Sequence, residues 1–421
     1  MSKVVKADYT AEAVAGFNSR TALEEAARCL LCHDAPCSKG CPAGTNPAKF
    51  IRSIRFRNVR GAAETIRENN ILGGTCARVC PYDNLCEEAC SRCGIDRPIE
   101  IGKLQRVAIE QEEAYGMKVL SVPAEKKAGK VACVGAGPAS LAVASELAKE
   151  GYDVTIFERE AKAGGVLTYG IVPSRLPQSV VDYDISKVEE LGVKFVFNTE
   201  VKAADLEGFD AAFIGVGLWG PNLPGIEGID LPGVYAAVDY LKAARSGAEG
   251  FNAGKRVLVV GGGDVAVDCA VTAKLQGAED VKIVYRRTIE EAPGNLNEFQ
   301  YALSLGIGMT TGMAPDSIVG DGKVEAVNFK GFRDEAAKLT LSADTIVFAT
   351  GQKAEDVSAI AGVDVTDKKT IAADANGITN VDGIFSAGDI VNGGKTVVEA
   401  VAAGKVAAFS IMQYLEKKGV K

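Results

Sequence analysis

Residues 130–160 read KVACVGAGPASLAVASELAKEGYDVTIFERE. The stretch predicts an apolar strand, a glycine turn, an amphipathic helix and a second strand that ends in an acidic residue, which is typical of a dinucleotide-binding βαβ unit. Gly135 permits the tight turn, Gly137 lets the backbone approach a pyrophosphate, and Ser140 is small enough for the helix to pack on the strand. Glu158 is placed to accept hydrogen bonds from a ribose 2′-hydroxyl.

The same unit recurs at residues 255–288, which read KRVLVVGGGDVAVDCAVTAKLQGAEDVKIVYRRT. Gly261, Gly263 and Ala266 occupy the fingerprint positions. Two copies of the unit predict two bound dinucleotides.

The second copy differs from the first at the end of its second strand. It has Arg286 and Arg287 where an NAD site shows an acid, and guanidinium groups can hold a 2′-phosphate with two hydrogen bonds. The arginines therefore favour NADPH over NADH. In the alternative interpretation both are ordinary surface residues, and Glu290 or Glu291 binds a plain ribose.

The remaining α/β pieces indicate that one Rossmann domain is inserted in another. A loop rich in glycine and proline at 163–177 is suited to lie along an extended cofactor, and short apolar strands at 345–352 and 383–390 run into glycine turns. The predicted fold class is α/β, with two nested Rossmann-like domains after an α-helical N-terminal domain. The predicted boundaries are 1–128 for the helical domain, 129–250 and 352–421 for the first Rossmann domain, and 251–351 for the second.

Nine of the eleven cysteines lie between Cys29 and Cys93. They form two runs, CLLCHDAPCSKGCP at 29–42 and CARVCPYDNLCEEACSRC at 76–93, and each run contains a Cys-Pro pair. Ferredoxin-type runs that share cysteines between two clusters have this character, so two iron–sulfur clusters are predicted. Helical spacing of apolar residues predicts helices around the cysteines, and residues 122–130 read as a linker.

Three other interpretations compete for the cysteines. Disulfides fit an odd number of cysteines in a chain of 421 residues poorly, because a chain of this length buries a core without them. Structural zinc is a stronger rival, since four-cysteine spacings overlap between zinc and iron sites. Buried inert thiols fit Cys133, within a predicted strand, and Cys269, within a predicted helix.

Composition excludes several classes of function. The net charge of −8 argues against a nucleic-acid partner, and no apolar run approaches the length of a bilayer. The single histidine, His33, argues against histidine metal sites and a Ser-His-Asp triad. The basic stretch at 49–60 is a solvated helix face or, alternatively, offsets cluster charge or docks an acidic partner. A cytoplasmic protein is expected.

Three long stretches carry a family resemblance, namely LLCHDAPCSKGCPAGTNPAKFIRSIRFRNVRGAAETIRENN at 30–70, CARVCP at 76–81 and PIEIGKLQR at 98–106. From about residue 20 onward the chain resembles glutamate synthase small subunits and the N-terminal portion of dihydropyrimidine dehydrogenase, including the flavin-containing subunits of the bacterial NAD(P)H-dependent enzyme. The resemblance implies two 4Fe–4S clusters, whose ligands are Cys29, Cys32, Cys37 and Cys90 for the first and Cys41, Cys80, Cys86 and Gln105 for the second. Cys76 and Cys93 are left over, and Cys93 is the alternative to Gln105.

The resemblance also implies the two dinucleotide sites. It places FAD on Gly137, Ser140, Glu158, Gly165, Arg175, Gly388, Asp389, Thr396 and Val397. It places the nicotinamide cofactor on Gly263, Asp264, Arg286 and Arg287.

The implied function is electron input, without a catalytic side chain, because the cofactors carry the chemistry. Electrons from NAD(P)H would pass through FAD and the clusters to an FMN-containing partner subunit that reduces uracil or thymine, which makes a hetero-oligomer the expected assembly. Alternative acceptors are glutamate synthase, a ferredoxin or a sulfur-reducing complex. From another class, the cysteines could form a zinc-stabilised docking module on a flavin reductase. A thioredoxin reductase needs a Cys-x-x-Cys where Cys269 stands alone.

Overall fold

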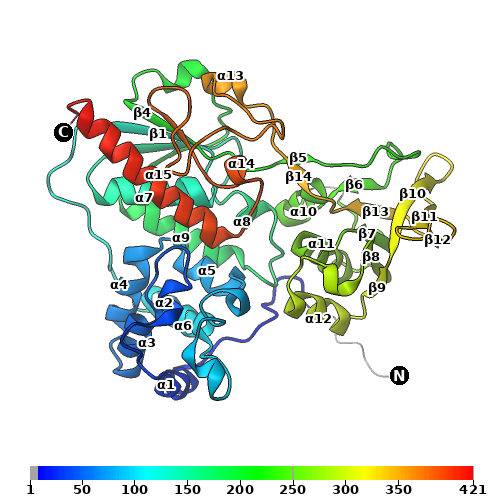
Figure 1. Ribbon diagram of the computed structural model, residues 1–421, viewed down its shortest axis with the longest axis horizontal. Coiled ribbons are helices and arrows are strands. Elements are labelled where there is room, and N and C mark those ends of the chain that lie inside the picture. Colours follow the sequence, from blue (N-terminus) through cyan, green and yellow to red (C-terminus); the bar gives the residue numbers. More distant parts are fainter. Residues whose placement is uncertain (1–7, 249–250, 421) are drawn as a thin grey trace. The chain divides into compact units, whose positions relative to one another are not determined.

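The computed structural model describes residues 8–248 and 251–420 (Figure 1). Residues 1–7, 249–250 and 421, which the predicted domains include, lie outside the described residues. The chain forms two compact units. We call them the outer unit, with residues 14–168, 178–218 and 354–420, and the inserted unit, with residues 8–13, 169–177 and 219–353.

The outer unit contains a parallel sheet of strand order β15-β4-β1-β2-β3. Its strands are β1 (Lys130–Val134), β2 (Asp153–Phe157), β3 (Lys194–Val196), β4 (Ala211–Ile214) and β15 (Ile384–Ser386). β15 pairs with β4 although most of the inserted unit separates them in the sequence. The sheet confirms that the chain leaves this Rossmann domain and returns to complete it.

Gly135 forms the turn between β1 and helix α7 (Pro138–Lys149). Its φ of +86° is one that other residues rarely adopt, and a Cβ there would lie 2.9 Å from the carbonyl oxygen of Gly215. Both the backbone conformation and the close approach therefore require glycine.

Helix α15 (Val397–Lys417) lies alongside α7 (Figure 1). Gly404 allows the close approach, because a Cβ there would lie 2.5 Å from the carbonyl oxygen of Ala139. By length and composition α15 could cross a membrane. The sequence analysis did not identify it, because Glu399 and Lys405 interrupt its apolar residues. Its packing on α7 buries part of the apolar face, and 44% of its most apolar stretch is buried inside the protein.

The N-terminal part of the outer unit is helical, as predicted. Its helices are α1 (Ser19–Arg28), α2 (Pro36–Lys39), α3 (Pro47–Arg55), α4 (Val59–Asn69), α5 (Gly73–Val79) and α6 (Ile101–Ala114), with 3₁₀ turns at Tyr82–Asn84 and Ser91–Gly94. The side chains of Asn18, Asn46 and Asn58 cap α1, α3 and α4 by accepting backbone hydrogen bonds. Apolar residues from α1, α3, α4 and α6 form one core, which also contacts Cys29, Cys37 and Cys90.

A buried ion cluster joins these helices to helix α9 (Gln178–Glu190) of the Rossmann domain. Arg67 on α4 is fully buried, and its Nε lies 2.9 Å from Oε2 of Glu112 on α6. Its Nη1 lies 2.7 Å from Oδ1 of Asp184 on α9. Asp184 also accepts hydrogen bonds from the backbone N–H groups of Gly74 and Thr75, in the first turn of α5. One buried cation therefore fixes four helices.

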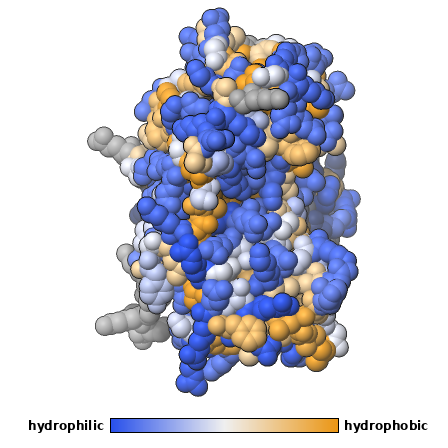
Figure 2. Space-filling view, turned by 90° about the vertical axis from the view of Figure 1, so that its left-hand side faces the viewer, coloured by the Kyte–Doolittle hydropathy of each residue, from blue (hydrophilic) through white to orange (hydrophobic). Residues whose placement is uncertain are grey.

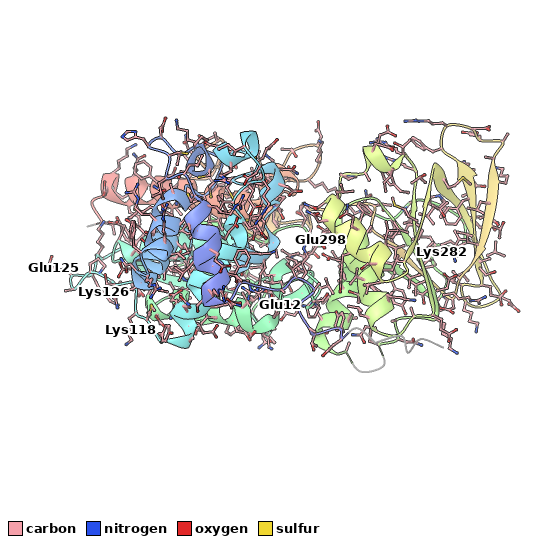
Figure 3. All side chains as sticks on the ribbon, turned by 90° about the horizontal axis from the view of Figure 1, so that it is seen from below. Glu12, Lys118, Glu125, Lys126, Lys282 and Glu298 are labelled. Carbon is pink, nitrogen blue, oxygen red and sulfur yellow. The ribbon has the colours of Figure 1, made fainter. Side chains whose placement is uncertain are left out.

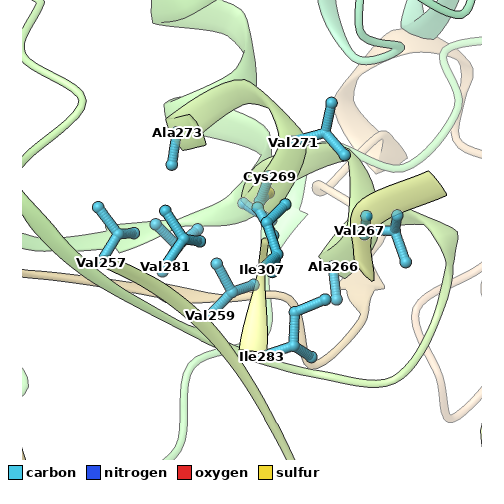
Figure 4. Close-up of a cluster of buried hydrophobic side chains, with 14 of the residues drawn as sticks. Val257, Val259, Ala266, Val267, Cys269, Val271, Ala273, Val281, Ile283 and Ile307 are labelled. Carbon is cyan, nitrogen blue, oxygen red and sulfur yellow. The ribbon is translucent and has the colours of Figure 1, made fainter. Parts of the chain in front are cut away.

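The inserted unit has its own parallel sheet, with strand order β6-β13-β7-β8-β9. Its strands are β6 (Val234–Ala236), β7 (Arg256–Val260), β8 (Asp280–Tyr285), β9 (Gly308–Thr311) and β13 (Thr345–Phe348), and its helices are α10 (Ala237–Ser246), α11 (Asp264–Leu275) and α12 (Leu296–Ser304). Apolar residues of β7, β8 and α11 form its core (Figure 4). Cys269 is in this core and Cys133 is buried in β1, which confirms both as inert core thiols.

Several elements were not predicted. An antiparallel sheet of β10 (Met313–Val319), β11 (Ala326–Gly331) and β12 (Lys338–Ser342) follows β9. The loop at 163–177 contains a short helix, α8 (Val166–Tyr169), where neither helix nor strand was expected. The remaining elements are β5 (Gly220–Pro221), β14 (Gln352–Lys353), α13 (Ser358–Ala361), α14 (Asp389–Asn392) and 3₁₀ turns at Ala203–Leu206 and Ile289–Glu291.

Charged residues are exposed in the linker and on the surface of the protein. The segment between α6 and β1 has no regular structure, and its Lys118, Glu125 and Lys126 are exposed and project outward (Figure 3). Most of the face shown in Figure 2 is hydrophilic, with apolar side chains in small groups. The linker therefore begins before the predicted residue 122 and ends where β1 begins.

Replacing Arg67 with methionine should lower the free energy of unfolding by about 3–5 kcal/mol, because Glu112 and Asp184 would then be buried without their cation. Chemical denaturation monitored by circular dichroism measures the change. Arg20→Met is the matched control, since the Arg20–Glu24 pair is exposed and should contribute less than about 0.5 kcal/mol. Equal effects of the two substitutions would contradict the role of the cluster.

Replacing Gly135 with alanine should destabilise the protein more than the same change at Gly192. Both glycines have nearly the same φ, +86° and +88°, so each substitution costs about 1–2 kcal/mol of backbone strain. Only at Gly135 does the added Cβ meet backbone, which adds about 1–3 kcal/mol, whereas nothing lies within 4 Å at Gly192. Thermal melts of the two variants give the comparison, and indistinguishable melting temperatures would show that the turn at Gly135 relaxes.

Candidate functional site

The first fingerprint forms a compact turn at the carboxyl end of β1. Glu158, at the end of β2, is buried, and its Oε2 accepts a hydrogen bond of 2.7 Å from the backbone N–H of Ala136. Its Oε1 accepts one of 2.9 Å from the N–H of Glu160. Burial raises the pKa of Glu158 above its usual value. The acidic residue therefore holds the glycine turn, and lies where a ribose would approach.

The start of α7 fits an anionic group. Its N-cap is Gly137, which supplies no capping side chain, so the first backbone N–H groups of the helix are left for a ligand. A Cβ on Gly137 would have no neighbour closer than 3.9 Å, so the space in front of the helix is open. Ser140 is fully buried, and its Oγ has no hydrogen-bond partner among the described residues. These features suit the pyrophosphate of a dinucleotide.

Other predicted FAD residues meet at the same helix start. A Cβ on Gly165 would lie 3.1 Å from the Cα of Gly137, and a Cβ on Gly388 would lie 3.0 Å from the Cβ of Ala139. Asp389 accepts a hydrogen bond of 3.0 Å from the backbone N–H of Lys395, and burial raises its pKa.

The start of α15 is held by a capping box. Thr396 accepts a hydrogen bond from the backbone N–H of Glu399, and the Glu399 carboxylate accepts one from the N–H of Thr396. Val397 is the first residue of the helix. Every predicted FAD residue except Arg175 therefore belongs to the outer unit.

Arg175 belongs to the inserted unit. Its Nη1 lies 3.3 Å from Oδ2 of Asp268 on α11, and its Nε lies 3.3 Å from Oε1 of Glu298 on α12, which is labelled in Figure 3. Burial raises the pKa of Asp268 to about 7, and Arg175 opposes this rise. Within its unit, Arg175 is a partner of two carboxylates.

The second fingerprint repeats the geometry of the first. A Cβ on Gly261 would lie 2.5 Å from the carbonyl oxygen of Ala349, and Ala266 is fully buried. Gly263 is the N-cap of α11 and supplies no capping side chain. Asp264 accepts a hydrogen bond of 2.7 Å from the backbone N–H of Asn295. The start of α11 therefore also fits a pyrophosphate.

The residues after β8 enter both interpretations of this site, and exposed arginines fit either a 2′-phosphate contact or ordinary surface residues. Arg286 and Arg287 are exposed, and the guanidinium of Arg286 lies 5.2 Å from the centre of the Phe332 ring. Glu291 accepts a hydrogen bond from the N–H of Thr288 and pairs with Arg333 at 2.8 Å. The arginines thus face solvent, while Glu291 already has a cationic partner.

The first predicted cluster has its four cysteines around one pocket. Cys29, Cys32, Cys37 and Cys90 all line it, together with apolar residues that include Ile51 and Ile99. Burial and the neighbouring thiol of Cys90 raise the pKa of Cys37 to about 11, and burial raises that of Cys29. Crowded thiols of this kind ionise readily only with a cation among them, as an iron–sulfur cluster provides.

The cysteines of the second predicted cluster form a second group that adjoins the first, because Cys86 is within electrostatic reach of Cys37 as well as of Cys41. Cys80 and Cys86 are each within electrostatic reach of Cys41. Burial raises the pKa of Cys86, and a hydrogen bond with Cys76 together with burial raises that of Cys80. Cys76, which the sequence analysis left over, is therefore part of this group. Cys76 lies four residues, or one helical turn, before Cys80, and this spacing could have predicted that the two thiols are neighbours.

Gln105 projects from α6 and is almost fully buried. Its Nε2 donates a hydrogen bond of 2.8 Å to the carbonyl oxygen of Gly73, at the start of α5, and so fixes the orientation of the amide. Cys93 is exposed, and its thiol contacts the carbonyl oxygens of Glu87 and Glu88. The Glu87 carboxylate accepts a hydrogen bond from Gly102 and holds the start of α6.

Zinc and an iron–sulfur cluster require different arrangements of the thiols. Among the residues that the structure describes, no three Cys, His, Asp or Glu side chains converge closely enough to hold one metal ion. A zinc site needs such convergence, because all of its ligands bind the same ion. In a 4Fe–4S cluster each cysteine binds a different iron, so the thiolates surround a volume. The four cysteines that line the pocket of the first predicted cluster surround such a volume.

Comparisons with known proteins agree with this geometry. Residues 6–117 match a family model described as dihydropyrimidine dehydrogenase domain II, 4Fe-4S cluster, and residues 129–404 match one described as pyridine nucleotide-disulphide oxidoreductase. The NADPH complex of Mycobacterium tuberculosis FprA is similar in fold, with a TM-score of 0.60 at 19% identity over 70% of this chain and 86% of that one.

Two curated relatives match nearly the whole chain. The NAD-dependent dihydropyrimidine dehydrogenase subunit PreT of Escherichia coli K12 is 46% identical over 97% of this chain and 98% of its own. The glutamate synthase [NADPH] small chain of the same strain is 32% identical over 95% of this chain and 93% of its own. The chain therefore belongs to the family of PreT-type dihydropyrimidine dehydrogenase subunits and glutamate synthase small chains, and is an NAD(P)H-dependent flavin and iron–sulfur oxidoreductase.

Proposed function

We propose that this chain is the electron-input subunit of a bacterial-type dihydropyrimidine dehydrogenase. It oxidises NAD(P)H through FAD and passes electrons through two 4Fe–4S clusters to a partner subunit, which contains FMN and reduces uracil or thymine to 5,6-dihydropyrimidines. The observation that carries the proposal is the arrangement of eight cysteines in two groups, seven of them proposed ligands, within a chain that also holds two dinucleotide fingerprints.

The proposed division of labour follows the chain. The helical part of the outer unit holds the two clusters, and the rest of the outer unit holds FAD. The inserted unit, whose main segment begins at residue 219 and not at the predicted residue 251, holds NAD(P)H. The first cluster takes Cys29, Cys32, Cys37 and Cys90, and the second takes Cys41, Cys80, Cys86 and Gln105. The fixed amide of Gln105 and the exposed thiol of Cys93, which donates to the carbonyl oxygen of Glu87, support Gln105 as the fourth ligand.

The residues of the chain bind and orient, because the cofactors supply the reactive groups. When bound, FAD accepts a hydride from the nicotinamide and releases electrons one at a time. The uncapped starts of α7 and α11 hold pyrophosphates, and Glu158 receives a ribose hydroxyl. The positive end of α15 at Thr396 and Val397 stabilises negative charge on the flavin. No side-chain acid or base is needed for hydride transfer.

The preferred nicotinamide remains a prediction. PreT relatives carry NAD in their names and glutamate synthase small chains carry NADPH. The exposed Arg286 and Arg287, and the pairing of Glu291 with Arg333, support a 2′-phosphate at this strand end. We therefore keep NADPH as the expected donor and NADH as the alternative.

The partner follows from the resemblance to named subunits. Relatives called dehydrogenase subunit and small chain belong to larger enzymes, which supports a hetero-oligomer for this chain. A reducing compartment such as the cytoplasm suits a chain whose clusters need free thiols. The second candidate function is the small subunit of glutamate synthase, favoured by the 32% identity over nearly the full length. Reduction of uracil by the chain with its natural partner separates the two.

Purified without oxygen, the chain should carry one FAD and about eight iron atoms, as two 4Fe–4S clusters require. Alone it should reduce dyes with NAD(P)H but leave uracil and thymine untouched, and the FMN partner should restore pyrimidine reduction. Cys37→Ser should lower the iron content to about four atoms and abolish pyrimidine reduction, while reduction of FAD by NAD(P)H persists. Iron analysis, dye assays and stopped-flow absorption give these quantities.

Cys93→Ser is the matched control, since Cys93 lies outside both proposed ligand sets and should leave the iron content unchanged. Four irons with one zinc in the unmodified chain would sink the two-cluster proposal. Uracil reduction by the isolated chain would overturn the electron-input assignment.

Replacing Arg286 and Arg287 together with glutamine should raise the Michaelis constant for NADPH by about ten-fold or more and change that for NADH little, because only NADPH has a 2′-phosphate. Steady-state dye reduction with each nucleotide measures both constants. Arg333→Gln is the control, because Arg333 already pairs with Glu291, and it should change the Michaelis constant for NADPH less than the double substitution does. Equal losses for the two nucleotides, or an unmodified chain that prefers NADH, would contradict the proposed role.

A further inference from the structure

Lys405 on α15 carries a positive charge to the second group of cysteines. Its Nζ donates hydrogen bonds of 2.7 Å to the carbonyl oxygen of Ala43 and 2.8 Å to that of Asn69. Ala43 lies two residues after Cys41, and Asn69 is the last residue of α4. Both acceptors are neutral main-chain oxygens, so the ammonium is held without a carboxylate bonded to it.

The surrounding structure fixes this lysine. Gly404, the preceding residue, packs so closely on α7 that no side chain fits there, which sets the rotation of α15. Ala43 is buried, and the Lys405 side chain is half-buried. The other charged or ionisable groups within electrostatic reach are Glu146 and Lys149 on α7, together with Cys41. Glu146 and Lys149 pair with each other at 2.6 Å, so their charges offset locally. Lys405 is therefore a positive charge within electrostatic reach of Cys41.

The position on α15 connects two proposed sites. The helix begins at Thr396, where the flavin is expected, and Lys405 follows about 13 Å further along the same helix. A fixed positive charge near a cluster favours its reduced form, because reduction adds one negative charge. Hydrogen bonds and net charge around a cluster are recognised controls of its potential.

We infer that Lys405 is a positioning residue that raises the reduction potential of the cluster on Cys41, Cys80, Cys86 and Gln105, and so makes this cluster a better acceptor of electrons from the flavin. The inference rests on the proposed function, since it requires the second cluster. The step it concerns is a one-electron transfer, in which the reduced flavin loses an electron and the cluster gains it. Lys405 itself neither gains nor loses a proton.

The test is an EPR-monitored redox titration of the whole, cluster-loaded protein. Lys405→Met should shift the equilibrium of one cluster about ten-fold toward its oxidised form, which is a fall of about 59 mV for one electron. Lys405→Arg, which keeps the charge, should retain most of the original potential. The other cluster should keep its potential in both variants.

Lys418→Met is the matched control. Lys418 follows the end of the same helix, about 20 Å beyond Lys405, and its charge is paired with Asp382 at 2.8 Å. At that distance solvent and salt screen its charge, so neither potential should change.

Each outcome decides one claim. If the Lys405→Met variant loses iron, the Lys405→Gln variant is titrated in its place, because the glutamine amide still donates to the carbonyl oxygens. Loss of iron in both variants, or full iron content with unchanged potentials, would overturn the role of Lys405. A wild-type chain with about four irons would instead overturn the two-cluster proposal. Iron content of the wild type therefore distinguishes failure of the proposed function from failure of this inference.

Discussion

The buried charge of Arg67 constrains the part of the protein where the helical domain meets the Rossmann domain. A guanidinium without exposed surface is tolerated only when carboxylates balance its charge, and here one comes from α6 and one from α9. Asp184 simultaneously accepts hydrogen bonds from the first turn of α5. That helix carries Cys76 and ends next to Cys80, and its Gly73 carbonyl orients Gln105. The position of the second cysteine group relative to the Rossmann domain thus depends on one ion cluster.

The two glycine fingerprints show how one motif serves two purposes. In the first, Glu158 turns inward and both of its oxygens hold backbone N–H groups of its own domain. In the second, Arg286 and Arg287 point to solvent. The helices that follow begin in the same way, with a glycine that supplies no capping side chain. The start of the helix is therefore built alike in both units, while the strand ends carry opposite charges.

The spacing of apolar residues along the sequence predicted the helices and strands that depend on neighbouring residues. The helices around the cysteines, both βαβ units and the burial of Cys133 and Cys269 follow from apolar spacing, and the structure confirms them. The antiparallel sheet β10-β11-β12 was missed, although buried residues alternate along β11. The short helix α8 was missed because glycine and proline on both sides of it suggested a loop.

The candidate site was less predictable wherever distant residues meet. Arg67 and Glu112 each stand four residues after a buried alanine, so their place in the apolar stripe was visible, but their partner Asp184 could not be read from the sequence. Arg175 was expected among the FAD residues, and its pairing with Asp268 and Glu298 depends on the fold of the inserted unit. The placement of Lys405 against Ala43 and Asn69 likewise requires the packing of α15.

The cysteine groups add a constraint on how the domain assembles. Cys37 and Cys41 are close in the sequence and both lie within electrostatic reach of Cys86, while Cys90 from the second run lines the pocket of Cys29, Cys32 and Cys37. Neither group can form from one run alone, because each draws thiols from both. The helices α3 and α4 lie between the runs, so their packing brings the two runs together. Because metal binding and folding are coupled in such sites, the ion cluster at Arg67, which holds α4, α5 and α6 together, is also a condition for building the second cysteine group.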